Sequence, residues 1–328
     1  TVSRLAPSSG TVTDTPLTVS CSSVSAMAPD YVRTVDPLPL SRRELLVGIA
    51  GMAVLAACGD DDDTDATGVS AGEEEGYSLL QFFAPAGALA AGQPVRIPFG
   101  LGTLDGAFRA DVPDTLEVAL VDPDGVELDR QSLPSLGDGL PRRYYTFEAT
   151  LPEGIYTLVA DIDGTSAELP VQIHPADTVL LVQPGDPMRL VDTPTNDDAR
   201  GVDPICTRTP TCEFHQQTLT DALETGNPVA FMISTPTFCQ TAVCGPVLDI
   251  MIQLSADYPD VEFVHAEVFE NPGDGVTADA ALTDAVTTYG MEFEPSIIVA
   301  DRDGTVVRRL DFIFAEEEMR SALDQVAG

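Results

Sequence analysis

The chain has 328 residues and a formal net charge of -37 at pH 7. All sixteen basic residues are arginine, and the sequence contains no tryptophan. Such a negative surface repels phosphate backbones, which excludes nucleic acid as a partner. The length is sufficient for a leader and two domains.

Residues 1–57 predict an export leader. Its apolar run, Leu45–Ala57, is shorter than the roughly 20 residues of a membrane-spanning helix and is typical of a signal-peptide core. Leu55-Ala56-Ala57-Cys58 resembles a bacterial lipobox, and the preceding Arg42-Arg43 resembles a twin-arginine signal. These resemblances imply a lipid on Cys58 that anchors the chain at the extracytoplasmic face of the cell membrane.

The stretches on either side of the signal-peptide core are expected to contribute nothing to the folded domains. Residues 1–26 lack any pattern and precede Met27, so we expect translation to begin at Met27 and Cys21 to be irrelevant. Residues 58–76 carry four consecutive aspartates and three consecutive glutamates. This composition predicts an acidic, disordered tether.

Residues 77–176 predict an all-β domain. Short apolar runs separated by turn signals such as Asp122-Pro123-Asp124-Gly125 favour a β-sandwich. Leu151–Leu158 resembles a strand entry of immunoglobulin-like domains. Residues 77–176 as a whole contain no catalytic constellation, which indicates a spacer or a partner-binding module. The expected strands are Ser78–Phe83, Val95–Phe99, Leu116–Val121, Tyr144–Thr150, Tyr156–Ile162 and Ala167–His174.

Residues 177–217 form a connector rich in Pro, Thr and Asp, with an expected strand at Val179–Val182. Cys206 and Cys212 lie inside this connector. In an oxidising compartment this pair predicts a structural disulfide. Two alternatives are a second redox pair that relays electrons, and a metal site that also uses His215, three residues after Cys212.

Residues 218–328 predict an α/β domain. Thr218 is the expected cap of the first helix, and the apolar spacing after Cys244 predicts a helix with one buried face. The expected order is helix Thr218–Thr225, strand Pro228–Ser234, helix Cys244–Tyr258, strand Val261–Val268, helix Ala278–Tyr289, strand Ser296–Ala300, strand Thr305–Asp311 and helix Glu316–Val326.

Cys239 and Cys244 lie where the predicted strand Pro228–Ser234 gives way to a helix, in Phe238-Cys239-Gln240-Thr241-Ala242-Val243-Cys244-Gly245-Pro246. A helix N-terminus favours the thiolate, because its dipole and free N–H groups stabilise negative charge. The element order and this motif resemble the thioredoxin-like fold family. That resemblance implies that Cys239 attacks, Cys244 resolves the mixed disulfide, and Pro295 precedes the next strand as a cis proline that shapes the substrate edge.

The motif departs from the common family pattern. Four residues separate the two cysteines instead of two, Phe238 stands where a tryptophan is usual, and Val229–Ile233 carries no buried acid. An alternative is a soft-metal site for copper, formed by Cys239, Cys244 and His265, because thiolates and imidazole suit that metal. A third possibility is a non-enzymatic binding protein whose disulfides only staple the fold.

The leading hypothesis is a membrane-anchored, extracytoplasmic protein that performs thiol–disulfide exchange on exported proteins. It requires no cofactor. Its residues are Cys239, Cys244 and Pro295, with Cys206 and Cys212 as a structural disulfide.

Overall fold

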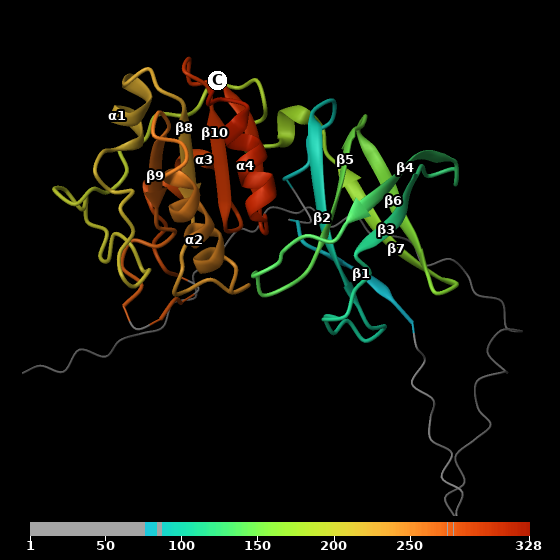
Figure 1. Ribbon diagram of the computed structural model, residues 1–328. Coiled ribbons are helices and arrows are strands. Elements are labelled where there is room, and N and C mark those ends of the chain that lie inside the picture. The colour runs from blue at the N-terminus through green and yellow to red at the C-terminus, as the bar shows by residue number, and fades with distance from the viewer. Residues whose placement is uncertain (1–75, 84–86, 274, 278) are drawn as a thin grey trace, which may run out of the picture. The chain divides into compact units, whose positions relative to one another are not determined.

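Figure 1 shows the computed structural model, which describes residues 76–328 apart from 84–86, 274 and 278. The predicted leader, the lipidation site Cys58 and the tether up to residue 75 lie outside the described residues. In the part of the chain that is described, no helix is both long and apolar enough to cross a membrane.

The first half of the described chain is all-β, as the sequence predicts. It forms two antiparallel sheets with buried apolar side chains on both. Strand β7 shows the period of two expected when one face is buried, with Ala167, Leu169, Val171 and Ile173 all buried. One sheet has the order β1 (Ser78–Gln81), β2 (Pro94–Gly102), β5 (Tyr145–Thr150); the other has the order β4 (Glu127–Pro134), β3 (Thr115–Val121), β6 (Gly154–Ile162), β7 (Thr165–Ile173).

The sequence patterns miss strand β4 and wrongly predict a strand at Val179–Val182. Strand β4 is an edge strand that pairs only with β3, and most of its side chains are exposed. It therefore lacks the apolar alternation that marks a strand in the sequence. Val179–Val182 has no strand conformation. Its apolar pattern reflects burial instead, because Leu181 and Val182 lie in the core without pairing to a sheet.

The second half is an α/β layer with the sheet order β11-β10-β8-β9. Strands β8 and β9 are parallel, while β10 is antiparallel to both β8 and β11. These strand directions and the element order are those of a thioredoxin-like fold, as the sequence predicts. The elements are α1 (Leu219–Glu224), β8 (Val229–Ile233), α2 (Cys244–Ser255), β9 (Glu262–Ala266), α3 (Asp284–Tyr289), β10 (Ser296–Ala300), β11 (Val306–Asp311) and α4 (Glu316–Asp324).

Helices cover both faces of this sheet (Figure 1). Ala230 and Met232 of β8 belong to the same buried cluster as α2 and α4. The alternate residues of β8, among them Phe231, belong to the cluster that contains α1 and α3. Burial on both faces explains why β8 reads as an uninterrupted apolar run rather than as an alternating one.

Helix α3 begins six residues later than the sequence predicts. The residues before it contact the segment that follows β9 and form no helical turn. Phe269 of that segment pairs with Leu282 in an isolated bridge. The backbone N–H of Thr283 donates to the Val268 carbonyl over 3.0 Å, and its hydroxyl donates to the Glu267 carbonyl over 2.7 Å. These tertiary hydrogen bonds replace the first turns expected from local sequence.

Candidate functional site

Cys239 and Cys244 lie together after strand β8. The strand ends at Ile233, an irregular loop follows, and α2 begins at Cys244. Cys244 is fully buried at the start of α2, whereas Cys239 is half-buried on the loop. Both thiols are free. The arrangement therefore leaves Cys239 partly exposed to solvent and keeps Cys244 buried.

Hydrogen bonds to Cys239 favour its thiolate. The Cys244 backbone N–H, at the start of α2, donates to Cys239 Sγ over 3.3 Å, and Thr241 Oγ1 lies 3.3 Å from the same sulfur. The hydrogen bond from the Cys244 thiol, together with those from Thr241 and the helix start, lowers the pKa of Cys239 to about 5. Burial and the adjacent Cys239 sulfur raise the pKa of Cys244 well above that of a free thiol.

Glu294 is a site residue that sequence reasoning missed. Its burial, with the neighbouring negative charge of Cys239, raises the pKa of this carboxyl to about 7, although a hydrogen bond from the Gln240 backbone partly opposes the shift. The same carboxylate contributes to the raised pKa of Cys244. The signal in the sequence was its position immediately before Pro295. Strand β8 carries no buried acid, and the acid near the cysteines comes from the loop before β10.

Pro295 lies where the sequence predicts, directly before β10, and the Glu294–Pro295 peptide is cis. Its carbonyl accepts a hydrogen bond from the Phe312 N–H over 2.8 Å. This contact joins the start of β10 to the end of β11, which holds Glu294 beside the cysteine loop.

Arg142, which lies between β4 and β5, contacts the cysteine loop. Its guanidinium donates to the Thr241 carbonyl over 3.1 Å and stacks on Phe108, with 4.3 Å from Cζ to the ring centroid. A mainly apolar pocket of about 150 Å³ lies beside this contact, and Thr241 and Val243 of the loop line it. The all-β half thus contributes directly to the surroundings of the cysteines.

Cys206 and Cys212 do not form the predicted disulfide. Their sulfur atoms lie 3.7 Å apart and both thiols are free, whereas a disulfide bond measures about 2.05 Å. His265, the third residue of the expected copper set with Cys239 and Cys244, contacts Cys212, His215 and Ser234 through its ring nitrogens. The fold thus brings His265 to the connector cysteines, although sequence analysis assigned His265 and these cysteines to different sites.

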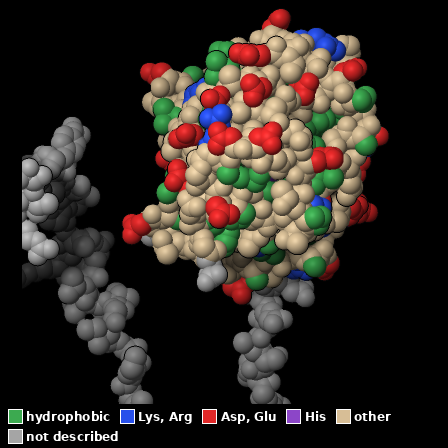
Figure 2. Space-filling view, turned by 90° about the vertical axis from the view of Figure 1, so that its left-hand side faces the viewer, with side chains coloured by type: hydrophobic (Ala, Val, Ile, Leu, Met, Phe, Trp, Pro, Cys, Tyr) green, Lys and Arg blue, Asp and Glu red, His purple; other side chains and the backbone are tan. Residues whose placement is uncertain are grey.

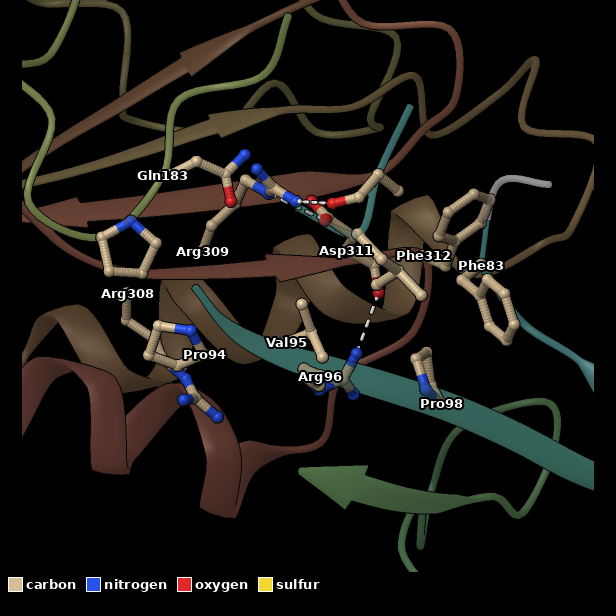
Figure 3. Close-up of a pocket in the computed structure, with 13 residues that line it drawn as sticks. Phe83, Pro94, Val95, Arg96, Pro98, Gln183, Arg308, Arg309, Asp311 and Phe312 are labelled. Carbon is tan, nitrogen blue, oxygen red and sulfur yellow. Dashed lines mark hydrogen bonds and ion pairs between the residues drawn. The ribbon is translucent and has the colours of Figure 1, made fainter. Parts of the chain in front are cut away.

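A second pocket lies between β2 and β11 (Figure 3). Three arginines line it, but each is paired with a carboxylate: Arg96 with Glu318, Arg308 with Glu148, and Arg309 with Asp311. Arg96 also donates to the Asp311 and Ile313 carbonyls. These guanidinium groups therefore all have carboxylate partners within the protein.

The surface carries the charge imbalance of the sequence. Acidic side chains are spread over the face shown in Figure 2, with few arginines among them. This face offers no continuous basic patch.

The comparisons with known proteins found similar chains among solved structures. Oxidised thioredoxin O2 from Arabidopsis thaliana is 16% identical, with a TM-score of 0.27 over 34% of this chain and 84% of the thioredoxin. Salmonella alpha-2-macroglobulin reacted with methylamine is 13% identical, with a TM-score of 0.24 over 73% of this chain and 15% of that protein. No family model and no curated protein matches the chain. Because both TM-scores are low, the thioredoxin-like assignment depends on strand order and direction.

Proposed function

We propose that this protein exchanges thiols and disulfides through Cys239 and Cys244. The observation that carries the proposal is the asymmetry of the pair: Cys239 is partly exposed at a helix start with its pKa lowered to about 5, and Cys244 is buried with its pKa raised. Such asymmetry gives one thiolate that is available at neutral pH and one thiol that remains protonated until it is needed.

In the reductive direction, the Cys239 thiolate attacks one sulfur of a substrate disulfide. A bond forms from Cys239 Sγ to that sulfur, and the other substrate sulfur leaves as a thiolate that takes a proton from solvent. Cys244 then loses its proton and attacks Cys239 Sγ. The substrate is released with both sulfurs reduced. The protein has given up two electrons and now holds a Cys239–Cys244 disulfide. The oxidative direction is the reverse.

Glu294 is proposed as the base for the second step. Burial raises the pKa of this carboxyl, and its electrostatic effect on Cys244 places it near that thiol, which suits a carboxylate that accepts the Cys244 proton. Pro295, next to Glu294 in the chain, is proposed to shape the edge that substrate approaches. The pocket beside Thr241 and Val243 supports an apolar substrate side chain near the cysteines.

The cellular setting is also a proposal. The lipobox-like Leu55–Cys58 supports a lipid anchor on Cys58 at the extracytoplasmic face of the membrane, with exported proteins as the partners. For the all-β half we propose an immunoglobulin-like sandwich, supported by its three-stranded sheet β1-β2-β5 and four-stranded sheet β4-β3-β6-β7. No cofactor enters the proposed exchange.

The deciding experiment is a redox titration of the Cys239–Cys244 pair in glutathione buffers, followed by mass spectrometry of the alkylated protein. We expect a reduction potential between about -270 and -120 mV, the range of exchange proteins, and a value below about -300 mV would contradict the proposal. The Cys244→Ser variant should trap a mixed disulfide at Cys239 with a small aromatic disulfide. The Cys239→Ser variant should trap none.

A further inference from the structure

We propose that Cys206, Cys212, His215 and His265 form a closed tetrahedral site for a zinc ion. Each residue supplies one donor atom, and these four atoms all lie within 4.8 Å of one another. The set is independent of the proposed exchange function, since none of these residues belongs to the Cys239–Cys244 pair.

Four of the six distances between donors match the edges of a zinc tetrahedron. With bonds of about 2.3 Å to sulfur and about 2.05 Å to nitrogen, the edges are about 3.8 Å for S···S, about 3.6 Å for S···N and about 3.3 Å for N···N. The two sulfur atoms are 3.7 Å apart. Cys212 Sγ lies 3.3 Å from His215 Nε2 and 3.5 Å from His265 Nδ1, and these two nitrogens are 3.3 Å apart.

The contacts of the second ring nitrogen of His265 support a ligand role. Its Nε2 faces the Ser234 carbonyl at 3.2 Å and the Ser234 hydroxyl at 2.9 Å. A proton on Nε2 is donated to Ser234, which leaves the lone pair of Nδ1 directed at Cys212 and His215. Metal-bound histidines are commonly oriented by such a contact on the second ring nitrogen.

The burial of the site favours a structural ion. His215 and His265 are fully buried, and Cys206 and Cys212 are each 5% exposed. Four protein donors already complete the coordination of zinc, so no position remains open for water or substrate. A donor set of two thiolates and two imidazoles also favours zinc over the hard cations magnesium and calcium.

The position in the fold explains what the ion stabilises. His265 lies on β9, the edge strand of the sheet, while the other three ligands belong to the irregular connector before α1. The connector has one backbone bond to this strand near the site, from the His265 N–H to the Phe214 carbonyl over 3.1 Å. A bound zinc ties the connector to the sheet and replaces the disulfide expected from sequence.

The cluster is also linked to the cysteine loop. Thr207, next to Cys206, accepts a hydrogen bond at its hydroxyl from the Thr237 N–H over 3.0 Å. The Thr237 hydroxyl donates to the Thr207 carbonyl over 2.6 Å. The Glu267 carboxylate, two residues after His265, accepts from the Thr207 N–H over 2.5 Å. The loop that carries Cys239 is therefore held by residues adjoining the zinc ligands.

The test is the metal content of the full chain, produced without a histidine tag in medium containing zinc and purified without chelator. Elemental analysis is expected to give one zinc ion per chain that survives dialysis against EDTA. The variants Cys212→Ser and His265→Ala should lose the zinc. The matched controls Cys239→Ser and His174→Gln, which alter a cysteine and a histidine outside the cluster, should retain it.

A second measurement covers variants that fail to fold. The unaltered chain, stripped of metal and titrated with Co²⁺, should develop the intense visible bands of tetrahedral cobalt and a near-ultraviolet thiolate-to-cobalt band, and Zn²⁺ should abolish both. The proposal is overturned if the unaltered chain binds neither ion. It is also overturned if copper or iron occupies the cluster, or if Cys206 and Cys212 resist alkylation until a reductant is added, which identifies a disulfide.

Discussion

The backbone N–H of Cys244 donates a hydrogen bond to Cys239 Sγ over 3.3 Å. This bond uses one of the N–H groups that a helix leaves unpaired at its start, so it places the Cys239 sulfur in the positive end of the α2 dipole. The spacing of four residues between the cysteines still permits this contact. It separates Cys239 from the helix but keeps its sulfur at the helix start.

Cys239 is expected to react as a thiolate across the neutral range. Because its pKa is lowered to about 5, the rate of alkylation by iodoacetamide should be near its maximum at pH 7 and fall as the pH drops through about 5. Cys244→Ala removes the thiol that is the largest cause of the shift, so its alkylation profile should move to higher pH. Cys244→Ser keeps a hydrogen-bond donor and should move less. Identical profiles for the two variants would contradict this account.

Glu294 is expected to control the second chemical step. In the unaltered protein, resolution of a trapped mixed disulfide should accelerate as the pH rises through the pKa of Glu294, which burial holds above its ordinary value even when Cys239 carries no charge. Glu294→Gln should slow resolution by about 100-fold at pH 7.5, the lower end for loss of a general base, and should flatten this pH dependence. Rapid-quench mass spectrometry measures the lifetime of the mixed disulfide.

Glu292→Gln is the matched control for Glu294, since Glu292 is exposed and two residues away. It should resolve the mixed disulfide at the unaltered rate. Equal slowing in both variants would show that the effect is one of overall charge and not of a base.

The buried pair of Arg96 and Glu318 is expected to stabilise the fold strongly. Arg96 Nε lies 2.6 Å from Glu318 Oε1, and their side chains are 6% and 12% exposed. Arg96→Met leaves the carboxylate buried without its partner and should lower the free energy of unfolding by about 3–5 kcal/mol. Arg130→Met, which breaks a surface pair with Glu127, should leave the same urea titration nearly unchanged, because solvent screens an exposed pair.

The same pair predicts a pH dependence of stability. Burial raises the pKa of Glu318, but the charge and hydrogen bonds of Arg96 and the hydrogen bond from Tyr144 outweigh it, so the pKa lies below the ordinary value. A lowered folded-state pKa contributes stability that is present above the unfolded value of about 4.3 and is lost as the pH falls through the folded value. Urea titrations of the unaltered chain should lose this contribution in acid, and Arg96→Met should show a smaller loss.

Arg142 is expected to restrain the cysteine loop from the all-β half. Arg142→Met keeps the aliphatic stem and removes the donor to the Thr241 carbonyl. Loss of one charge-assisted hydrogen bond, worth about 1.5–3 kcal/mol, should raise amide hydrogen exchange in residues 239–243 by at least about tenfold. The control Arg143→Met, whose side chain bonds Ser135 and Asp138, should leave exchange in this loop unchanged.

Local sequence predicted most of the elements that position the cysteines. The Thr218 side chain caps α1 as expected, accepting from the Asp221 N–H over 2.9 Å, and Cys244 begins α2 at the predicted residue. Such features depend on neighbours within about one helical turn, so a pattern of residues is sufficient to reveal them. The same reasoning fails for β4, where an exposed edge strand leaves no apolar period.

Tertiary structure alone decided which reactive side chains meet. His265 on β9 joins Cys212 across 53 positions of sequence, and Glu294 reaches the surroundings of Cys239 from the start of β10. The connector that carries Cys206 and Cys212 has no periodicity, so its path cannot be derived from local pattern. The sequence by itself determined where the thiol, imidazole and carboxyl groups stand along the chain. The sheet order and the path of the connector determined which residues act together, because distance and burial set both the donor geometry and the pKa values.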